Sequence, residues 1–293
     1  NYPVGTDNVA LGDTALDSLT SGGNNTAVGT EALTSNASGN ANTAMGRAVL
    51  NSTTGSQNSG FGSLALYDNT SGQYNTALGA EALTNNTTAS QNTGIGYRAL
   101  FSNTTAPEGT AVGYQALYSN TTGATNTAVG RQTLYTNTTG VQNVGLGARA
   151  LRSNTTGEKN VSVGMDSMYS NTTASYNTAL GYQSLYANTT GTRNTALGMQ
   201  ALKTVTTGNY NTAVGYQALE LNTGSGNTAV GDQALEANTS GASNSALGDD
   251  ALVSNTTGSY NSAFGESALG SNTTASNNTA VGYQAGYSNT TGT

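Results

Sequence analysis

The residue types that carry most enzyme and metal chemistry are scarce in this chain. Its 293 residues include no His and no Cys, with only 15 acidic and 8 basic side chains. Without His or Cys, zinc and most transition metals lack their usual ligands, and no thiol can act as a nucleophile. No acid, base and nucleophile are grouped in a way that sets a few segments apart. We therefore expect no enzyme, no cofactor, and neither a catalytic nor a metal site.

Repeated carboxylates in turns could bind calcium, as they do in calcium-binding β-rolls. The turns of this chain contain Asn and Thr instead, so a regular array of calcium sites is not expected. The aspartates are scattered along the chain: Asp7, Asp13, Asp17, Asp68, Asp166, Asp232, Asp249 and Asp250.

The most frequent candidate for covalent chemistry is Asn-x-Ser/Thr, the acceptor signal for N-linked glycosylation. It lies in a recurring N-T-T-G segment, where Asn is also a favoured turn residue and where stacked Asn side chains can hydrogen-bond as a ladder. Two interpretations stay open: glycans along one edge of the molecule, or a structural Asn ladder. The candidate acceptors are Asn36, Asn51, Asn69, Asn86, Asn103, Asn120, Asn137, Asn154, Asn171, Asn188, Asn238, Asn255, Asn272 and Asn289.

These segments belong to a repeat of about 17 residues with the consensus N-T-A-V-G-x-x-A-L-x-x-N-T-T-G-x-x. A short fixed period is typical of a one-dimensional stack in which each unit packs only against its neighbours. The spacing is 17 residues except for two intervals of 16, Gly46–Gly62 and Gly215–Gly231. The glycine that closes N-T-A-V-G recurs at Gly12, Gly29, Gly46, Gly62, Gly79, Gly96, Gly113, Gly130, Gly147, Gly164, Gly181, Gly198, Gly215, Gly231, Gly248, Gly265 and Gly282.

Three apolar columns emerge when the repeats are aligned, and we expect all three to form the core. The first is Leu in almost every repeat, with Met168 and Gly286 as the exceptions. The second is the small residue before that Leu. The third is the residue before the conserved glycine, for example Val28, Met45 and Phe61.

The sequence predicts an all-β fold, a β-solenoid or β-roll of 17 stacked coils. N-T-A-V-G is short, β-branched and bounded by turn residues, as a strand is. At about 3.3 Å per residue, a 17-residue coil has room for two short strands and two turns. The adjacent Ala-Leu pair does not alternate as a strand would, so a strand followed by a short helical turn remains the alternative. Coils spaced by ~4.8 Å would give a rod of about 80 Å.

The two shortened repeats predict where the surface loop lies. Both lose one residue around N-T-T-G, at Asn51–Gly55 and at Asn222–Gly224, while the apolar columns keep their phase. Because length changes are tolerated at exposed turns, we expect N-T-T-G to be a surface loop.

Two further columns are polar. The Asn that precedes each strand, as in Asn25 and Asn42, is expected to form an internal ladder that caps the turn. The adjacent Thr column suggests an ice-binding face, but such faces need two Thr columns, and adjacent strand residues point in opposite directions. A stripe of Tyr follows the Leu column over several coils and predicts a packed ladder, with a carbohydrate- or partner-binding strip as the alternative: Tyr118, Tyr135, Tyr169 and Tyr186.

Net charge and hydropathy limit the partners. The formal net charge is −7, and there is no basic run, so nucleic acid is not expected as a partner. Apolar runs are only a few residues long, so no segment is expected to insert into a membrane. We divide the chain into an N-terminal segment with the first strand, residues 1–12, and a continuous solenoid, residues 13–293.

The repeat unit resembles those of tail-fibre-domain and adhesin-like surface proteins. The resemblance rests on N-T-A-V-G-Y-Q-A-L-Y-S-N-T-T-G, as in 111–123 and 211–219, and extends over the whole chain. The strand N-T-A-V-G is also similar to the repeated strand in the head domains of trimeric autotransporter adhesins. The first resemblance implies an extracellular fibre or adhesin at a cell or virion surface, and the second implies a trimer.

Neither end of the sequence shows the polar cap that a solenoid usually carries. We therefore expect a structural subunit of an extracellular fibre or filament that assembles with itself head to tail. One alternative is an adhesin or phage-like fibre shaft that binds cell-surface glycans, and another is that the sequence is an excerpt of a longer repetitive protein. The candidate assembly contacts are Asn1, Tyr2, Pro3, Val4, Gly5, Gly286, Tyr287 and Gly292.

Overall fold

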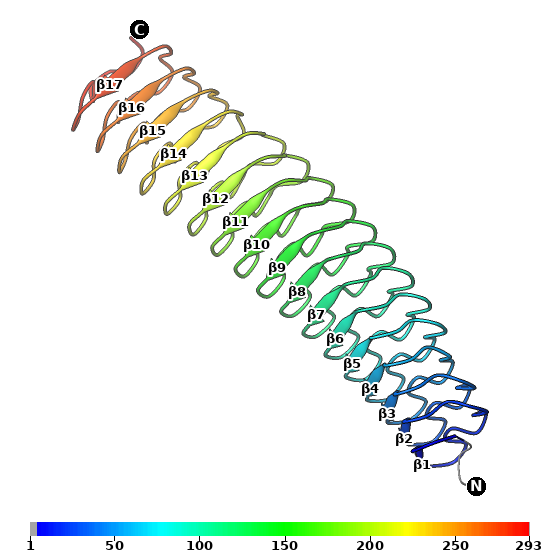
Figure 1. Cartoon of the computed structure of the whole chain (residues 1–293). Coiled ribbons are helices and arrows are strands. Elements are labelled where there is room, and N and C mark those ends of the chain that lie inside the picture. The colour runs from blue at the N-terminus through cyan, green and yellow to red at the C-terminus, as the bar shows by residue number, and fades with distance from the viewer. Residues whose placement is uncertain (1–4, 293) are drawn as a thin grey trace. The chain divides into compact units, whose positions relative to one another are not determined.

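The structure is a computed structural model that describes residues 5–292. Within these residues the protein is all-β, with three-residue strands and no helix. The chain forms two compact units, Asn1–Asn143 and Val144–Thr293, and each is described by itself. Each is a β-solenoid in which every coil contributes one strand (Figure 1). The predicted fold class is confirmed.

Successive strands within each unit pair in parallel and in register, so that Ala111 lies beside Ala128 and Ala196 beside Ala213. The strands of the first unit are β1 (Val9–Leu11), β2 (Thr26–Val28), β3 (Thr43–Met45), β4 (Ser59–Phe61), β5 (Thr76–Leu78), β6 (Thr93–Ile95), β7 (Thr110–Val112) and β8 (Thr127–Val129). Those of the second unit are β9 (Val144–Leu146), β10 (Val161–Val163), β11 (Thr178–Leu180), β12 (Thr195–Leu197), β13 (Thr212–Val214), β14 (Thr228–Val230), β15 (Ser245–Leu247), β16 (Ser262–Phe264) and β17 (Thr279–Val281).

Each strand is formed by the central residues of N-T-A-V-G. Its middle residue points inward, as the complete burial of Ala111 in β7 illustrates. The glycine that follows the strand is required by its conformation and by close packing. Gly113 has φ +134°, and a Cβ there would lie 2.6 Å from the carbonyl oxygen of Gly130 in the next coil. Only glycine fits such a position, which accounts for the glycine column.

The Ala-Leu segment forms neither the second strand nor the helical turn predicted from the sequence. Gln115 and Leu117 are both left-handed, with φ 54° and 51°, and Ala116 and Leu117 are both fully buried. Left-handed residues break the alternation of an extended strand, so two adjacent side chains can face the interior. The segment still bonds from coil to coil, because the Leu117 N–H donates to the Thr133 carbonyl at 3.0 Å.

The Leu column is left-handed in every coil. Its Leu and Met residues have φ between 47° and 55°, and Gly286 has φ 61°. None of them is β-branched. Left-handed conformations cost roughly 1–2 kcal/mol for an ordinary residue, and a β-branched side chain is worse there. Packing in the core holds these residues in place.

We expect Leu117→Ile to destabilise the protein much more than Leu117→Met, although all three side chains are similar in size. Met already occupies this column at residue 168, and a Leu-to-Met exchange usually costs under about 1.5 kcal/mol. Ile is β-branched, so holding it in the left-handed conformation adds strain of about 1–2 kcal/mol. Thermal unfolding followed by circular dichroism would test this, and equal melting temperatures for the two variants would contradict it.

The prediction that the whole N-T-T-G segment is a surface loop is wrong in part. In the coil that contains Asn103, this Asn and Ala106 are buried, while Thr104 and Thr105 lie outside. In the shortened segments the buried positions are kept by Thr53 and Asn222, and a single Thr separates each from the turn glycine. Each shortened segment thus lacks one residue of the exposed Thr pair.

Candidate functional surface

The interior of each coil holds two asparagine ladders. We call the Asn of N-T-T-G the turn ladder, and the Asn that precedes the strand in most coils the inner ladder; Gly109 replaces it before β7. In the turn ladder, Asn103 Nδ2 donates to Asn86 Oδ1 at 2.8 Å and to the Ala106 carbonyl at 3.1 Å. In the inner ladder, the backbone N–H of Asn75 donates to Asn58 Oδ1 at 3.0 Å. The predicted internal ladder is confirmed.

The two ladders meet at the carbonyl that closes each turn. The Ala89 carbonyl accepts from Asn75 Nδ2 at 2.9 Å and from Asn86 Nδ2 at 3.0 Å. Gly39 plays the same part for Asn25 and Asn36, at 2.9 and 3.2 Å. A buried amide must find partners for both its N–H groups and its oxygen, and these ladders supply them from the coil itself and from its neighbours.

Of the fourteen candidate glycosylation sites, all but Asn51 and Asn289 belong to the buried part of the turn ladder and are at most 1% exposed. Their Nδ2 atom, which would carry the glycan, donates to the turn carbonyl and in most of them also to the neighbouring Asn, as in Asn137. Asn51 lies two residues before the ladder position and is half-buried, and Asn289 is half-buried in the last coil. A glycan on a buried member of the ladder would have to be attached before the coil closes.

The turn ladder is interrupted at Val205, which is fully buried where most coils have Asn. The preceding member, Asn188, still donates to Asn171 and to the Gly191 carbonyl. Its Oδ1 atom, however, is buried without a hydrogen-bond partner, because a valine side chain has no N–H to donate. An unsatisfied buried acceptor costs about 1–3 kcal/mol.

We expect Val205→Asn to stabilise the protein by about 1 kcal/mol, because its Nδ2 would satisfy Asn188 Oδ1 and the Gly208 carbonyl. Val205→Ala is the matched control, since it removes apolar packing without adding a donor, and it should lower the melting temperature. Thermal unfolding of the three proteins measures the effect. A Val205→Asn protein that melts below the parent would count against the ladder as a source of stability.

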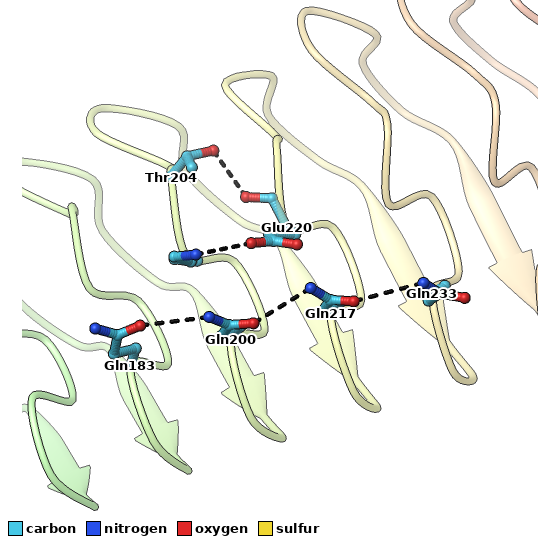
Figure 2. Close-up of polar contacts among 7 residues, drawn as sticks. Gln183, Gln200, Thr204, Gln217, Glu220 and Gln233 are labelled. Atoms are coloured by element: carbon cyan, nitrogen blue, oxygen red, sulfur yellow. Dashed lines mark hydrogen bonds and ion pairs between the residues drawn. The ribbon is translucent and has the colours of Figure 1, made fainter.

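Glutamine and tyrosine side chains form ladders on the outside. Gln183, Gln200, Gln217 and Gln233 bond head to tail at 3.4, 3.2 and 3.4 Å (Figure 2). Lys203 forms an ion pair with Glu220 of the next coil at 3.0 Å. These glutamines follow the conserved glycine by two residues. Because each bond joins adjacent coils, the ladder reinforces the backbone stacking.

The tyrosine stripe is a packed ladder, as predicted. Tyr118 and Tyr135 stack with ring centroids 5.1 Å apart and planes 11° apart, and Tyr169 and Tyr186 stack at 5.4 Å and 16°. Phe101 extends the first stack, 5.2 Å from Tyr118. Sugars bind aromatic side chains through the ring face. In these stacks the ring faces are directed at one another along the coil axis, which leaves mainly the ring edges facing outward.

Scattered carboxylates come together on the second unit, which the sequence analysis missed. Glu236 is close enough to Glu220, Asp250 and Asp232 for their charges to act on it. Burial first, and then these charges, raise the pKa of Glu236; burial and then Asp249 and Asp232 raise the pKa of Asp250. The signal was the alignment of the repeats, which places Glu220 beside Glu236 and Asp232 beside Asp249 in successive coils. Within residues 5–292 no group of three His, Cys, Asp or Glu has the geometry to hold a metal ion.

A raised pKa in the folded chain means that the folded state binds the proton more tightly than the unfolded state. Stability therefore falls as the pH rises from the ordinary carboxyl pKa through the raised one. We expect Glu236→Gln to raise the melting temperature at pH 7 and to have little effect at pH 3, where the parent Glu is already neutral. Glu108→Gln, at an exposed position of the first unit, is the control and should change little at either pH. A larger effect of Glu236→Gln at pH 3 than at pH 7 would have the wrong sign.

The third apolar column, predicted to be core, lies on the outside. It is the residue before the conserved glycine, which shares the outer face of the strand with Thr because the residue between them points inward. The face thus carries one Thr column beside an apolar one, not the pair of Thr columns of an ice-binding surface. In the first unit the column comprises Leu11, Val28, Met45, Phe61, Leu78, Ile95, Val112 and Val129. In the second unit we call it the strand-face stripe, and it comprises Leu146, Val163, Leu180, Leu197, Val214, Val230, Leu247, Phe264 and Val281.

The candidate assembly residues Asn1, Tyr2, Pro3 and Val4 lie outside the described residues. Gly5 is exposed, and it stands at a turn-glycine position against the Gly22 carbonyl.

The candidate assembly residues of the last coil are also accessible. Gly286 takes the Leu position, and the Tyr287 side chain, 46% exposed, covers Gly270. Gly292 is exposed, and its carbonyl accepts from Asn278 Nδ2 at 3.3 Å.

Comparisons with known proteins add no relative. The chain matches no model of a known protein family, and no curated protein is significantly similar to it. In the described part of the chain there is no helix long and apolar enough to cross a membrane. The described residues present the outer ladders and the strand faces on their surface.

Proposed function

We propose that this protein is a structural subunit of an extracellular fibre or filament and that its copies assemble end to end. One observation carries the proposal: successive strands in each unit pair in the same parallel register. The free side of any coil therefore offers the same donors and acceptors that an adjoining coil uses. A coil of the same kind is the natural occupant of such an edge, and repeated addition gives an open filament.

The edges of the first and last strands have defined polar groups. In β1 the Val9 N–H and the Leu11 carbonyl are bonded to the next coil, each at 2.8 Å, so Ala10 directs its N–H and carbonyl to the other side. In β16 the Ser262 N–H donates onward to the Asn278 carbonyl at 2.8 Å. The equivalent N–H in β17, that of Thr279, points the same way and would donate to a following coil.

The resemblance of the repeat to those of tail-fibre and adhesin-like proteins supports an extracellular or virion-surface location for such a fibre. It also supports the second candidate, a shaft that holds a glycan-binding tip. The stacked tyrosines favour the structural role, because their ring faces are used within the ladder. The two candidates differ in what the chain does alone, since a filament subunit polymerises and a shaft stays discrete.

Electron microscopy of the purified full chain tests the proposal. We expect filaments with an axial repeat near ~4.8 Å, the spacing of hydrogen-bonded strands. Thr279→Pro removes the N–H that would pair with a following coil and should abolish the filaments, whereas Thr279→Val keeps this N–H and should preserve them. Deletion of Asn1–Asp7 should also weaken assembly. Discrete particles from the unmodified chain, or filaments that survive Thr279→Pro, would contradict end-to-end assembly by strand addition.

A further inference from the structure

The strand-face stripe is apolar at all nine of its positions, of which five are exposed and four are half-buried. Leu180, Leu247 and Val281 are 49%, 46% and 72% exposed. Two residues further along, five of the nine coils carry another exposed apolar side chain, and three carry an exposed carboxylate, Asp232, Asp249 or Glu266. The five apolar residues are Met165, Tyr182, Met199, Tyr216 and Tyr283. The stripe runs across β9–β17 and contains no ionisable residue.

The fold itself does not require apolar residues at the stripe. Small residues on the inner side of the strands make the core contacts, as Ala213 does in β13, and the outer Thr column shows that polar residues are accepted on the same face. Soluble monomers rarely expose a contiguous apolar patch larger than a few hundred Å². A partner that covers the stripe would explain why Leu, Val and Phe recur there.

The size of the stripe matches that of a specific protein interface. Nine strands spaced by ~4.8 Å give a length of roughly 40 Å. The five coils that carry Met or Tyr beside the stripe are roughly 16 Å wide, five residues at ~3.3 Å each, and the other four are roughly 10 Å wide. The summed area, about 600 Å², is what each partner contributes to the smaller specific interfaces, which bury about 1,200 Å² in total.

We propose that the strand-face stripe binds the same stripe of a second copy of this chain, so that two subunits associate side by side. A partner must present apolar side chains at the strand spacing over the whole length of the stripe, and an identical stripe does so. Two such sheets can pack face to face at about 10 Å with their side chains interdigitated. This contact is lateral and independent of the end-to-end assembly proposed above.

The surroundings of the stripe favour two copies over three. In a closed ring of three, each subunit contacts its neighbours through two different sides, and both would be apolar. Here only the stripe itself is uniformly apolar, because the columns on both sides of it carry charged residues in some coils, Asp232 and Glu266 on one side and Arg193 on the other. A single apolar column suits an isologous pair, in which the same patch meets itself.

The test measures the molar mass of the full chain by sedimentation velocity and light scattering. The Thr279→Pro background prevents end-to-end growth, so that only lateral association contributes to the mass. We expect a dimer of the 29.3-kDa chain. The double substitution Leu180→Asp and Leu247→Asp should produce a monomer, with the dimer Kd raised more than ~100-fold, because it places charges inside a desolvated interface.

The control carries the same charges in the same two coils but on exposed turns, as Thr190→Asp and Thr257→Asp. It should stay dimeric, and both variants should keep the parental circular dichroism and melting temperature. A monomeric Thr279→Pro protein, a trimer, or a dimer that is unaffected by aspartate in the stripe would each overturn the proposal. If filaments fail to form but the lateral dimer persists, only the end-to-end assembly is refuted.

Discussion

Every coil rises by one strand spacing, and the backbone hydrogen bonds between coils impose this rise on all other groups. Strands bonded to one another lie about 4.8 Å apart, so equivalent residues of successive coils must tolerate contact at that distance. Glycine meets this demand after the strand, where a Cβ at Gly198 would lie 2.2 Å from the Gly215 carbonyl. Alanine meets it inside the strand. Planar amides and aromatic rings also tolerate this spacing, because amides of successive coils can hydrogen-bond to one another and aromatic rings can stack.

The same constraint explains why many of the buried side chains are polar. A narrow coil has room for one layer of side chains, so the turn carbonyls are buried with no water to solvate them. Asn25 and Asn36 satisfy one such carbonyl, that of Gly39, and Asn25 also bonds along the stack by accepting from the backbone N–H of Asn42. Leucine fills the remaining space only when its backbone is left-handed, which brings it to the same side as the alanine before it. The conformational strain of these residues is offset because each coil is held by both neighbours.

Periodicity was sufficient to predict the solenoid, the glycine and leucine columns and the inner Asn ladder, because each column follows from the repeat length alone. It was not sufficient for the path inside a coil. Strand alternation and left-handed turns give similar apolar patterns over a few residues, so the column that contains Leu180 was placed in the core although it is exposed. One signal was available, since the Leu column never contains Val, Ile or Thr, which are poorly suited to positive φ. The acidic cluster around Glu236 could also have been predicted, by comparing equivalent positions of neighbouring coils.

Surface and interior differ in what they demand of a partner. Inside, the ladders accept only a coil of the same kind, because an Asn without its counterpart leaves an atom such as Asn188 Oδ1 unsatisfied. Outside, the chain varies freely where the side chains reach solvent, as among Tyr182, Met199 and Asp232, but the residue before the conserved glycine stays apolar in all the strands described. A position that is exposed in the single chain and yet uniformly apolar is under a constraint that the coil does not impose. The two directions of recognition, along the stack through hydrogen bonds and across it through apolar contact, are therefore chemically distinct and can be altered one at a time.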